Sequence, residues 1–386
     1  MTIAAGRARG RRTASELRER PAISAPAELR PSSDVDAERA RVDLQPGLGL
    51  KGLVLVIPIA AALAVGAGGA DSSTVILAPL VTYSLPVVVI VAFWWEDWPG
   101  TRVRSSWSGW ADTVLVAIGG IALTAVGQAI AGGFDPRGIF DPSPGPGHVP
   151  TFPATMPLAG AAFVAMLQLT LVGEGWPLRS LPRIPAGLAA LAIAWAIALI
   201  VYWTLAGVPA PPGSAVTARR GPVAGADLGA ALVVVSAFQV VFYVLWHGWP
   251  FAPIAPRALR LTCAHLTTVG AGLTTYVLAR EALDVGPLRL TAAGGCFIAA
   301  ALLIGMLMEG WLGRSLSAAA ERLVTLLAAA ALGAALAFAL YALAATMSFA
   351  RASPDEWVGH AGLNAIAVST ILHVAIGRRW PFLPSG

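Results

Sequence analysis

The chain has 386 residues, of which 56% are hydrophobic and only 12% are charged. Soluble globular proteins carry about 25% charged residues, so this composition excludes an ordinary soluble protein. Several apolar runs exceed the roughly 18 residues that a helix needs to cross a bilayer. These runs are continuous rather than alternating, which excludes a transmembrane barrel. The net charge of +5 suits a membrane surface and gives no reason to expect a nucleic-acid partner.

Residues 1–50 form a segment rich in Arg, Ala and Pro that is almost free of aromatic side chains. Such a segment buries too little apolar surface to fold alone, so we predict a disordered tail. Its basic residues favour the cytoplasmic side of the membrane. Residues 51–386 form a second region, the polytopic membrane domain.

Ten apolar segments are predicted to span the membrane, and the lipid bilayer is therefore the first expected partner. They cover residues 51–69, 75–95, 112–132, 154–173, 186–207, 227–247, 259–279, 290–309, 322–346 and 357–377. With a cytoplasmic N-terminus, the inside loops and C-terminus carry ten Arg and the outside loops six. This bias predicts a multi-pass protein of the cell membrane with both termini in the cytoplasm. The second and third outside loops are rich in Gly and Pro and are long enough to form a cap.

A short sequence motif that ends in Trp-Pro recurs after every second apolar segment, as in residues 95–99 and 173–177, and we call it the Trp-Pro phrase. The full copies centre on Trp98, Trp176 and Trp249, a degraded copy lies at Trp311, and the last at Trp380. The spacings of 78, 73, 62 and 69 residues predict a repeat of one helical hairpin. Because each unit has two spans, the repeats run parallel. The predicted fold is an all-α membrane protein of about ten helices in five parallel hairpins.

The phrase has a structural interpretation that requires no chemistry. Pro moves the preceding Trp out of the helical region, and Trp anchors in the headgroup layer. We therefore assign all five Trp residues as structural anchors. The functional alternative is a cytoplasmic vestibule ringed by the loops. Its polar candidates lie two residues before Trp: Glu96, Glu174, His247 and Glu309, with Arg378 in the last copy. In a ring, these side chains could pair with Arg residues of neighbouring loops.

Uncharged polar residues within the spans are candidates for a substrate path. They are Gln168, Gln239, His265, Asn364 and His373, and each could instead make a hydrogen bond between helices. No Asp or Glu lies near a predicted midplane, which argues against a carrier that needs a central carboxylate.

His265 and His373 are predicted at similar depth on separate helices, and b-type haem is the one cofactor considered. Buried, hydrogen-bonded histidine is the simpler interpretation, so neither a cofactor nor a metal site is predicted. The chain contains no phosphate-binding loop, HExxH or CxxC motif.

Three functions remain open on sequence alone. The favoured one is a permease for a small molecule or ion, with a cytoplasmic vestibule of Trp-Pro loops. The second is a non-catalytic scaffold or complex subunit that binds a protein partner through residues 1–50. The third and least favoured is a membrane enzyme, including the haem variant.

Overall fold

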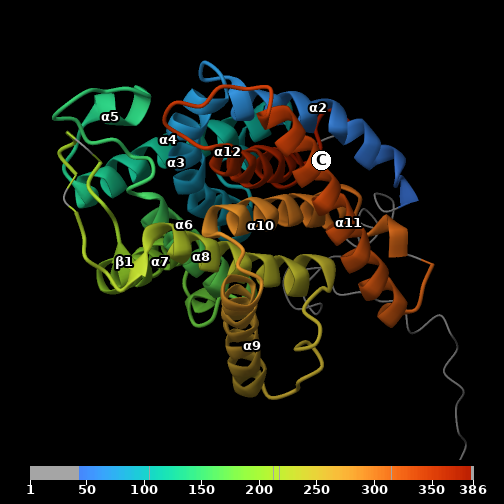
Figure 1. The fold of residues 1–386 in the computed structure, drawn as a ribbon. Helices are drawn as coiled ribbons and strands as arrows, with labels where there is room; N and C mark the ends of the chain where they lie inside the picture. The colour runs from blue at the N-terminus through green and yellow to red at the C-terminus, as the bar shows by residue number, and fades with distance from the viewer. Residues whose placement is uncertain (1–42, 104, 212, 217, 314, 384–386) are drawn as a thin grey trace, which may run out of the picture.

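A computed structural model describes residues 43–383 except 104, 212, 217 and 314 (Figure 1). The predicted tail lies almost wholly outside the described residues. The α-helices are α2 (Gly47–Val65), α3 (Ala70–Val89), α4 (Ser105–Ala131), α5 (Pro136–Phe140), α6 (Met156–Leu167), α7 (Arg183–Leu205), α8 (Gly225–Val240), α9 (Arg257–Val277), α10 (Pro287–Leu302), α11 (Ala318–Ala344), α12 (Pro354–His360) and α13 (Ala367–Ile371). Two strands of two residues each, β1 (Ala206–Gly207) and β2 (Val223–Ala224), pair in parallel.

The helical character of all ten predicted spans is confirmed. Eight of the helices in the described part of the chain are long and apolar enough to cross a membrane. The other two predicted spans do not meet both requirements of length and apolar composition. Met156–Val172 is a shorter apolar helix, and α9 has a more polar composition. By helix composition, the chain is a multi-pass membrane protein.

Five helices pack into a closed inner ring. α3, α6, α8, α10 and α12 contact one another in that order, and α12 also contacts α3. These helices are mostly buried: within the most apolar stretch of Ala70–Trp94, 72% of residues are buried inside the protein. The ring therefore consists of the second helix of each predicted hairpin.

The first helix of each predicted hairpin lies outside the ring. α4, α7, α9 and α11 pack against α3, α6, α8 and α10 respectively, each on the ring helix that precedes it in the chain. α2 packs on the segment that follows α12, so the first and last spans lie together (Figure 1). In α11, only 17% of the most apolar stretch is buried, because its remaining surface faces outward.

Glycine allows the last ring helix to approach its neighbour closely. α12 continues as a π-helical segment, Ala361–Ile366, which packs against α10. A Cβ atom on Gly362 would lie 2.9 Å from the backbone N of Cys296, closer than real Cβ contacts. Small residues at such crossings are the usual means of packing helices in membranes.

The two loops that were predicted to lie outside and to form a cap, residues 133–153 and 208–226, do contact each other. The Gly147 N–H donates to the Gly213 carbonyl, and the Ala215 N–H donates to that of His148. Asp135 caps α5 and also accepts hydrogen bonds from the Val149 N–H and the His148 ring. Burial raises the pKa of Asp135, but these hydrogen bonds outweigh it and hold the pKa below its ordinary 3.8.

Substitution of Gly362 by Ala should destabilise the ring. The new Cβ must displace the α10 backbone, which costs about 1–3 kcal/mol. Thermal unfolding followed by size-exclusion chromatography should show a lower midpoint than for the wild type. Gly270→Ala is the matched control, because a Cβ there meets nothing within 4 Å. Equal midpoints for the two variants would contradict the close α10 approach.

Acid should loosen the cap through Asp135. A carboxyl with a depressed folded pKa contributes stability above its unfolded pKa and loses it as pH falls through the folded pKa. We expect exchange of the Val149 amide, corrected for intrinsic rates, to accelerate below pH 3.8. Asp135→Asn should exchange rapidly already at pH 5 to 6, where the wild type stays protected. A variant as protected as the wild type would show that Asp135 does not hold the cap.

Candidate functional site

Each of the five phrase copies follows a ring helix that ends in a π-helical turn. These turns are Ile90–Trp94, Gln168–Val172, Val241–Leu245, Leu303–Leu307 and Leu372–Ile376. In every copy, the next N–H donates to the carbonyl five residues earlier, as from Trp95 to Ile90 and from Gly377 to Leu372. The N–H two residues further on donates to the carbonyl six residues earlier. The copies thus satisfy their terminal carbonyls in the same way.

Two consecutive residues with positive φ reverse the chain in each copy. The first is the polar position two residues before Trp, with φ of 52° at Glu96 and 48° at Arg378. The second is Gly175, Gly248 or Gly310 in the middle copies, but Asp97 and Arg379 in the outer ones. Glycine is favoured there because it alone adopts this conformation without steric cost.

The five Trp residues that were predicted as anchors follow directly after the reversal. Trp176, Trp249, Trp311 and Trp380 are each more than a third exposed, and Trp98 is half-buried. The peptide bond from Trp to Pro is cis in the four copies that have Pro.

Two ion pairs and one cation–π contact join the first three phrase copies to their neighbours. Glu174 binds Arg260 at the start of α9 through two hydrogen bonds of 2.7 and 3.0 Å. Glu96 lies 3.8 Å from Arg183 at the start of α7. In the third copy, the Arg322 guanidinium of α11 stacks over the Trp249 ring at 4.6 Å. In each case, a residue of one phrase copy contacts an Arg in the segment that follows the next copy in the sequence.

The last two copies close this chain of contacts into a circuit. Glu309 of the fourth copy binds Arg379 of the fifth at 2.8 Å. Arg378 of the fifth binds Asp97 of the first at 3.0 Å and Asp112 of α4 at 2.6 Å. Burial raises the pKa of Asp97 above its ordinary value, even though Arg378 donates to it. We call this circuit the ion-pair belt; ion pairs make four of its five links between copies, and the Arg322–Trp249 contact makes the fifth.

Arg379 is the most buried basic residue of the belt, with 3% of its surface exposed. Besides Glu309, its guanidinium donates to the carbonyls of Met306 and Leu307, where α10 and its π-helical turn end. Gln45 also donates to the Leu307 carbonyl. Sequence reasoning assigned Arg379 only as an inside charge, because no pattern marks one Arg of a pair as buried.

The predicted path residues fall into three places. Gln168 accepts from Gln239 at 2.7 Å and donates to His265 at 2.9 Å, which links α6, α8 and α9. Asn364 lies apart from them, 3.2 Å from the Thr82 hydroxyl of α3.

The third place is His373, which lies against Gly52 of α2 and the Phe382 ring. Two further buried residues, Thr268 and Ser369, were not predicted as path candidates, although each has a side-chain oxygen without a hydrogen-bond partner. Thr and Ser occur throughout the apolar segments, so their type alone gave no signal.

The two histidines considered for haem contact different helices. His265 bonds to Gln168 near the end of α6, whereas His373 lies against α2. Within the described residues, no group of three or more His, Cys, Asp or Glu could hold a metal ion.

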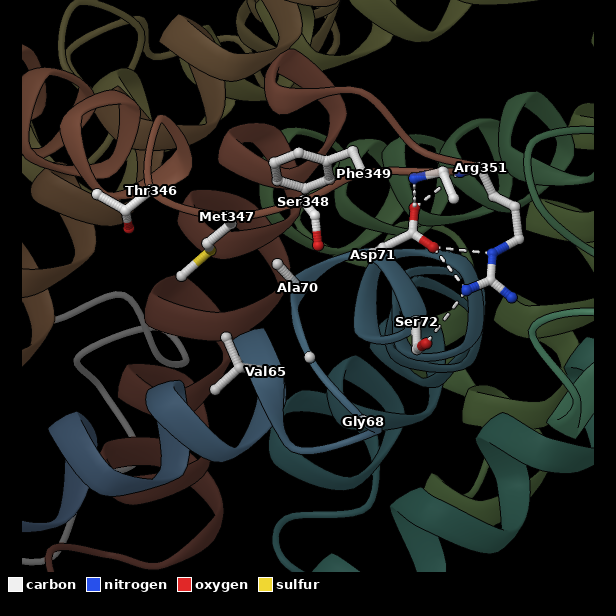
Figure 2. A pocket seen from close by; sticks show the side chains of 12 residues that line it. Val65, Gly68, Ala70, Asp71, Ser72, Thr346, Met347, Ser348, Phe349 and Arg351 are labelled. Atoms are coloured by element: carbon white, nitrogen blue, oxygen red, sulfur yellow. Dashed lines mark hydrogen bonds and ion pairs between the residues drawn. The ribbon is translucent and has the colours of Figure 1, made fainter.

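A cavity of about 660 Å³ lies at the opposite end of α3 from its phrase (Figure 2). Asp71 and Arg351 form one wall and are joined at 2.7 Å. The Asp71 carboxylate also accepts the backbone N–H groups of Ala350, Arg351 and Ala352. Because these donors satisfy the carboxylate, its role here is to hold residues 350–352 against α3.

Comparison with known proteins gives no relative from which a function could be carried over. No protein-family model, no curated protein and no solved structure matches the chain. The functional argument therefore rests on the residues themselves.

Removal of the Arg379 guanidinium should be costly. Arg379→Met leaves Glu309 and two helix-end carbonyls short of a buried donor, for which we expect a loss of about 3–5 kcal/mol. Thermal unfolding in detergent measures the change. Arg183→Gln is the control, because its partner Glu96 is 77% exposed at 3.8 Å and such pairs contribute about 0–1 kcal/mol. Similar losses in both variants would contradict the special position of Arg379.

Proposed function

We propose that the protein is a permease for small uncharged polar solutes. The observation that carries this proposal is a set of buried polar atoms, in the ring helices and in the helical segments that continue α12, that have no hydrogen-bond partner. They include Oε1 of Gln239 on α8, Nδ1 of His360 on α12, Oγ of Ser369 on α13 and Nε2 of His373 in the π-helical turn that follows. An unpaired buried polar group costs about 1–3 kcal/mol, so a solute that supplies the missing partner would be stabilised there. Amide, hydroxyl and imidazole groups suit an uncharged solute.

The ion-pair belt supports a closed vestibule at the Trp-Pro end of the permease. Acidic and basic side chains bridge four of the five gaps between the loops, as Glu174 and Arg260 do, and Arg322 over the Trp249 ring bridges the fifth. Such partly exposed pairs exchange readily with water, so they can open and close at low cost. The excess of Arg in these loops favours the cytoplasmic side of the cell membrane. The shared hydrogen-bond pattern of the five copies supports the parallel hairpin repeat.

A scaffold is the second candidate, and the same belt favours it. A closed circuit of contacts makes the five loops one connected surface. In this alternative, that surface and residues 1–50 would hold a protein partner, and no solute would cross. The contacts of His265 and His373 support neither haem binding nor an enzyme.

Solute flux separates the two candidates. Purified full-length protein in liposomes should accelerate osmotic swelling with glycerol, urea or acetamide over empty liposomes. Glu174→Gln weakens the belt and should raise the rate several-fold, because the charge that holds Arg260 is lost. Arg289→Gln removes an exposed ion pair outside the belt and should leave the rate unchanged.

Swelling equal to that of empty liposomes for all three solutes, in the wild type and in Glu174→Gln, would overturn the permease. The scaffold alternative then predicts that a defined partner co-purifies from native membranes. Deletion of residues 1–42 should abolish that association.

A further inference from the structure

A cluster of four polar side chains joins two ring helices to an outer helix. Gln168 follows α6, Gln239 lies on α8, and His265 and Thr268 lie on α9. Gln239 and Thr268 have no exposed surface. We call these four residues the amide cluster.

The hydrogen bonds of the cluster have a fixed direction. Nε2 of Gln239 donates to the Val164 carbonyl at 3.2 Å and to Oε1 of Gln168 at 2.7 Å. Since Oε1 of Gln168 is the acceptor there, its Nε2 donates to Nδ1 of His265 at 2.9 Å. A His whose Nδ1 accepts is neutral and carries its proton on Nε2. The orientation of Gln239 thus determines the tautomer of His265.

Two atoms of the cluster have no partner. They are Oε1 of Gln239 and Oγ1 of Thr268. The register of the two antiparallel helices sets them opposite each other, because a Cβ on Gly272 would lie 2.7 Å from the Cα of Val235. Gln239 is one turn after Val235 on α8, and Thr268 is one turn before Gly272 on α9. An unpaired acceptor and an unpaired hydroxyl therefore lie at the same level of the α8–α9 interface.

We infer that the amide cluster binds the primary amide group of a small uncharged solute. The solute N–H would donate to Oε1 of Gln239, and its carbonyl would accept from the Thr268 hydroxyl. This pairing satisfies both orphaned atoms and involves no charge. The inference rests on the proposed function and names the substrate class of the same protein.

Binding requires α9 to separate from α8, because both side chains are fully covered in this structure. Two groups of polar contacts hold α9 near its ends. At one end, Arg260 binds Glu174, and at the other Arg280 and Tyr276 bind Asp227 at 2.9 and 2.8 Å. Between them, α9 packs against α8 through small residues such as Gly272. Release of one end would uncover the amide cluster.

Binding can be measured separately from transport by NMR of protein with 15N-labelled histidine in lipid bilayers. His265→Asn identifies the His265 signals, which should show a proton on Nε2 alone. Acetamide should shift these signals, and N,N-dimethylacetamide, which lacks an N–H donor, should not. In Gln239→Leu with Thr268→Val, the acetamide dissociation constant should rise about tenfold or more. Thr275→Val, at an exposed position on the same helix, is the matched control.

Thermal unfolding supplies a second measurement. Thr268→Val removes an unpaired buried hydroxyl and should raise the unfolding midpoint, so a loss of binding in that variant would not reflect misfolding. His265 signals that ignore acetamide, while acetamide still crosses liposomes, would overturn the site but leave the permease standing. Signals that shift without any flux would support the site and overturn transport.

Discussion

The end of each ring helix is the constraint on which the rest of the structure depends. A helix leaves its last carbonyls without partners, and in a membrane protein they must be satisfied before the chain turns back. In all five copies, a π-helical turn followed by two residues with positive φ provides N–H donors for these carbonyls. The first of these residues carries a polar side chain in every copy. Glu96, Glu174, Glu309 and Arg378 occupy equivalent positions in their turns, so the side chain of each reaches a neighbouring copy or the segment after it. The turns that end the ring helices therefore also supply the contacts that connect the copies around the ring.

The sign of the charge at this position explains how the circuit closes. Glu174 and Glu309 are acidic and find Arg partners in the following unit. In the last copy, both residues with positive φ are basic, Arg378 and Arg379. This copy therefore needs an acidic partner in the fourth copy and another in the first. Glu309 supplies one, and Asp97 with Asp112 supplies the other. A last copy with an acid instead would set like charges against Glu309 and Asp97.

Sequence reasoning predicted the helices well but not their places in the fold. Helix existence follows from apolar length, which a bilayer demands of every span. Inner and outer helices cannot be told apart in this way, because lipid is as apolar as a protein core. The spans Ala70–Trp94 and Ala318–Ala344 have the same mean hydropathy of 2.4, yet 72% and 17% of their apolar stretches are buried.

The path residues could be predicted only one at a time from the sequence, without their contacts to one another. Depth follows from position in a span, but rotation about the helix axis does not, so the pairing of Gln168 with His265 required coordinates.

The placement of charge on α9 bears on whether this helix can move. Arg260 and Arg280 are bound near its two ends, where water can replace Glu174 or Asp227 as their partner. Its middle holds no charge, and contact with α8 there is by small residues and uncharged polar groups. A helix with charges in its middle would strand them in hydrocarbon when it separated, at a cost of several kcal/mol. A helix held by ion pairs at its ends and by van der Waals contact between them avoids that cost. Separation of α9 from α8 therefore exposes only groups that an uncharged solute or water can satisfy.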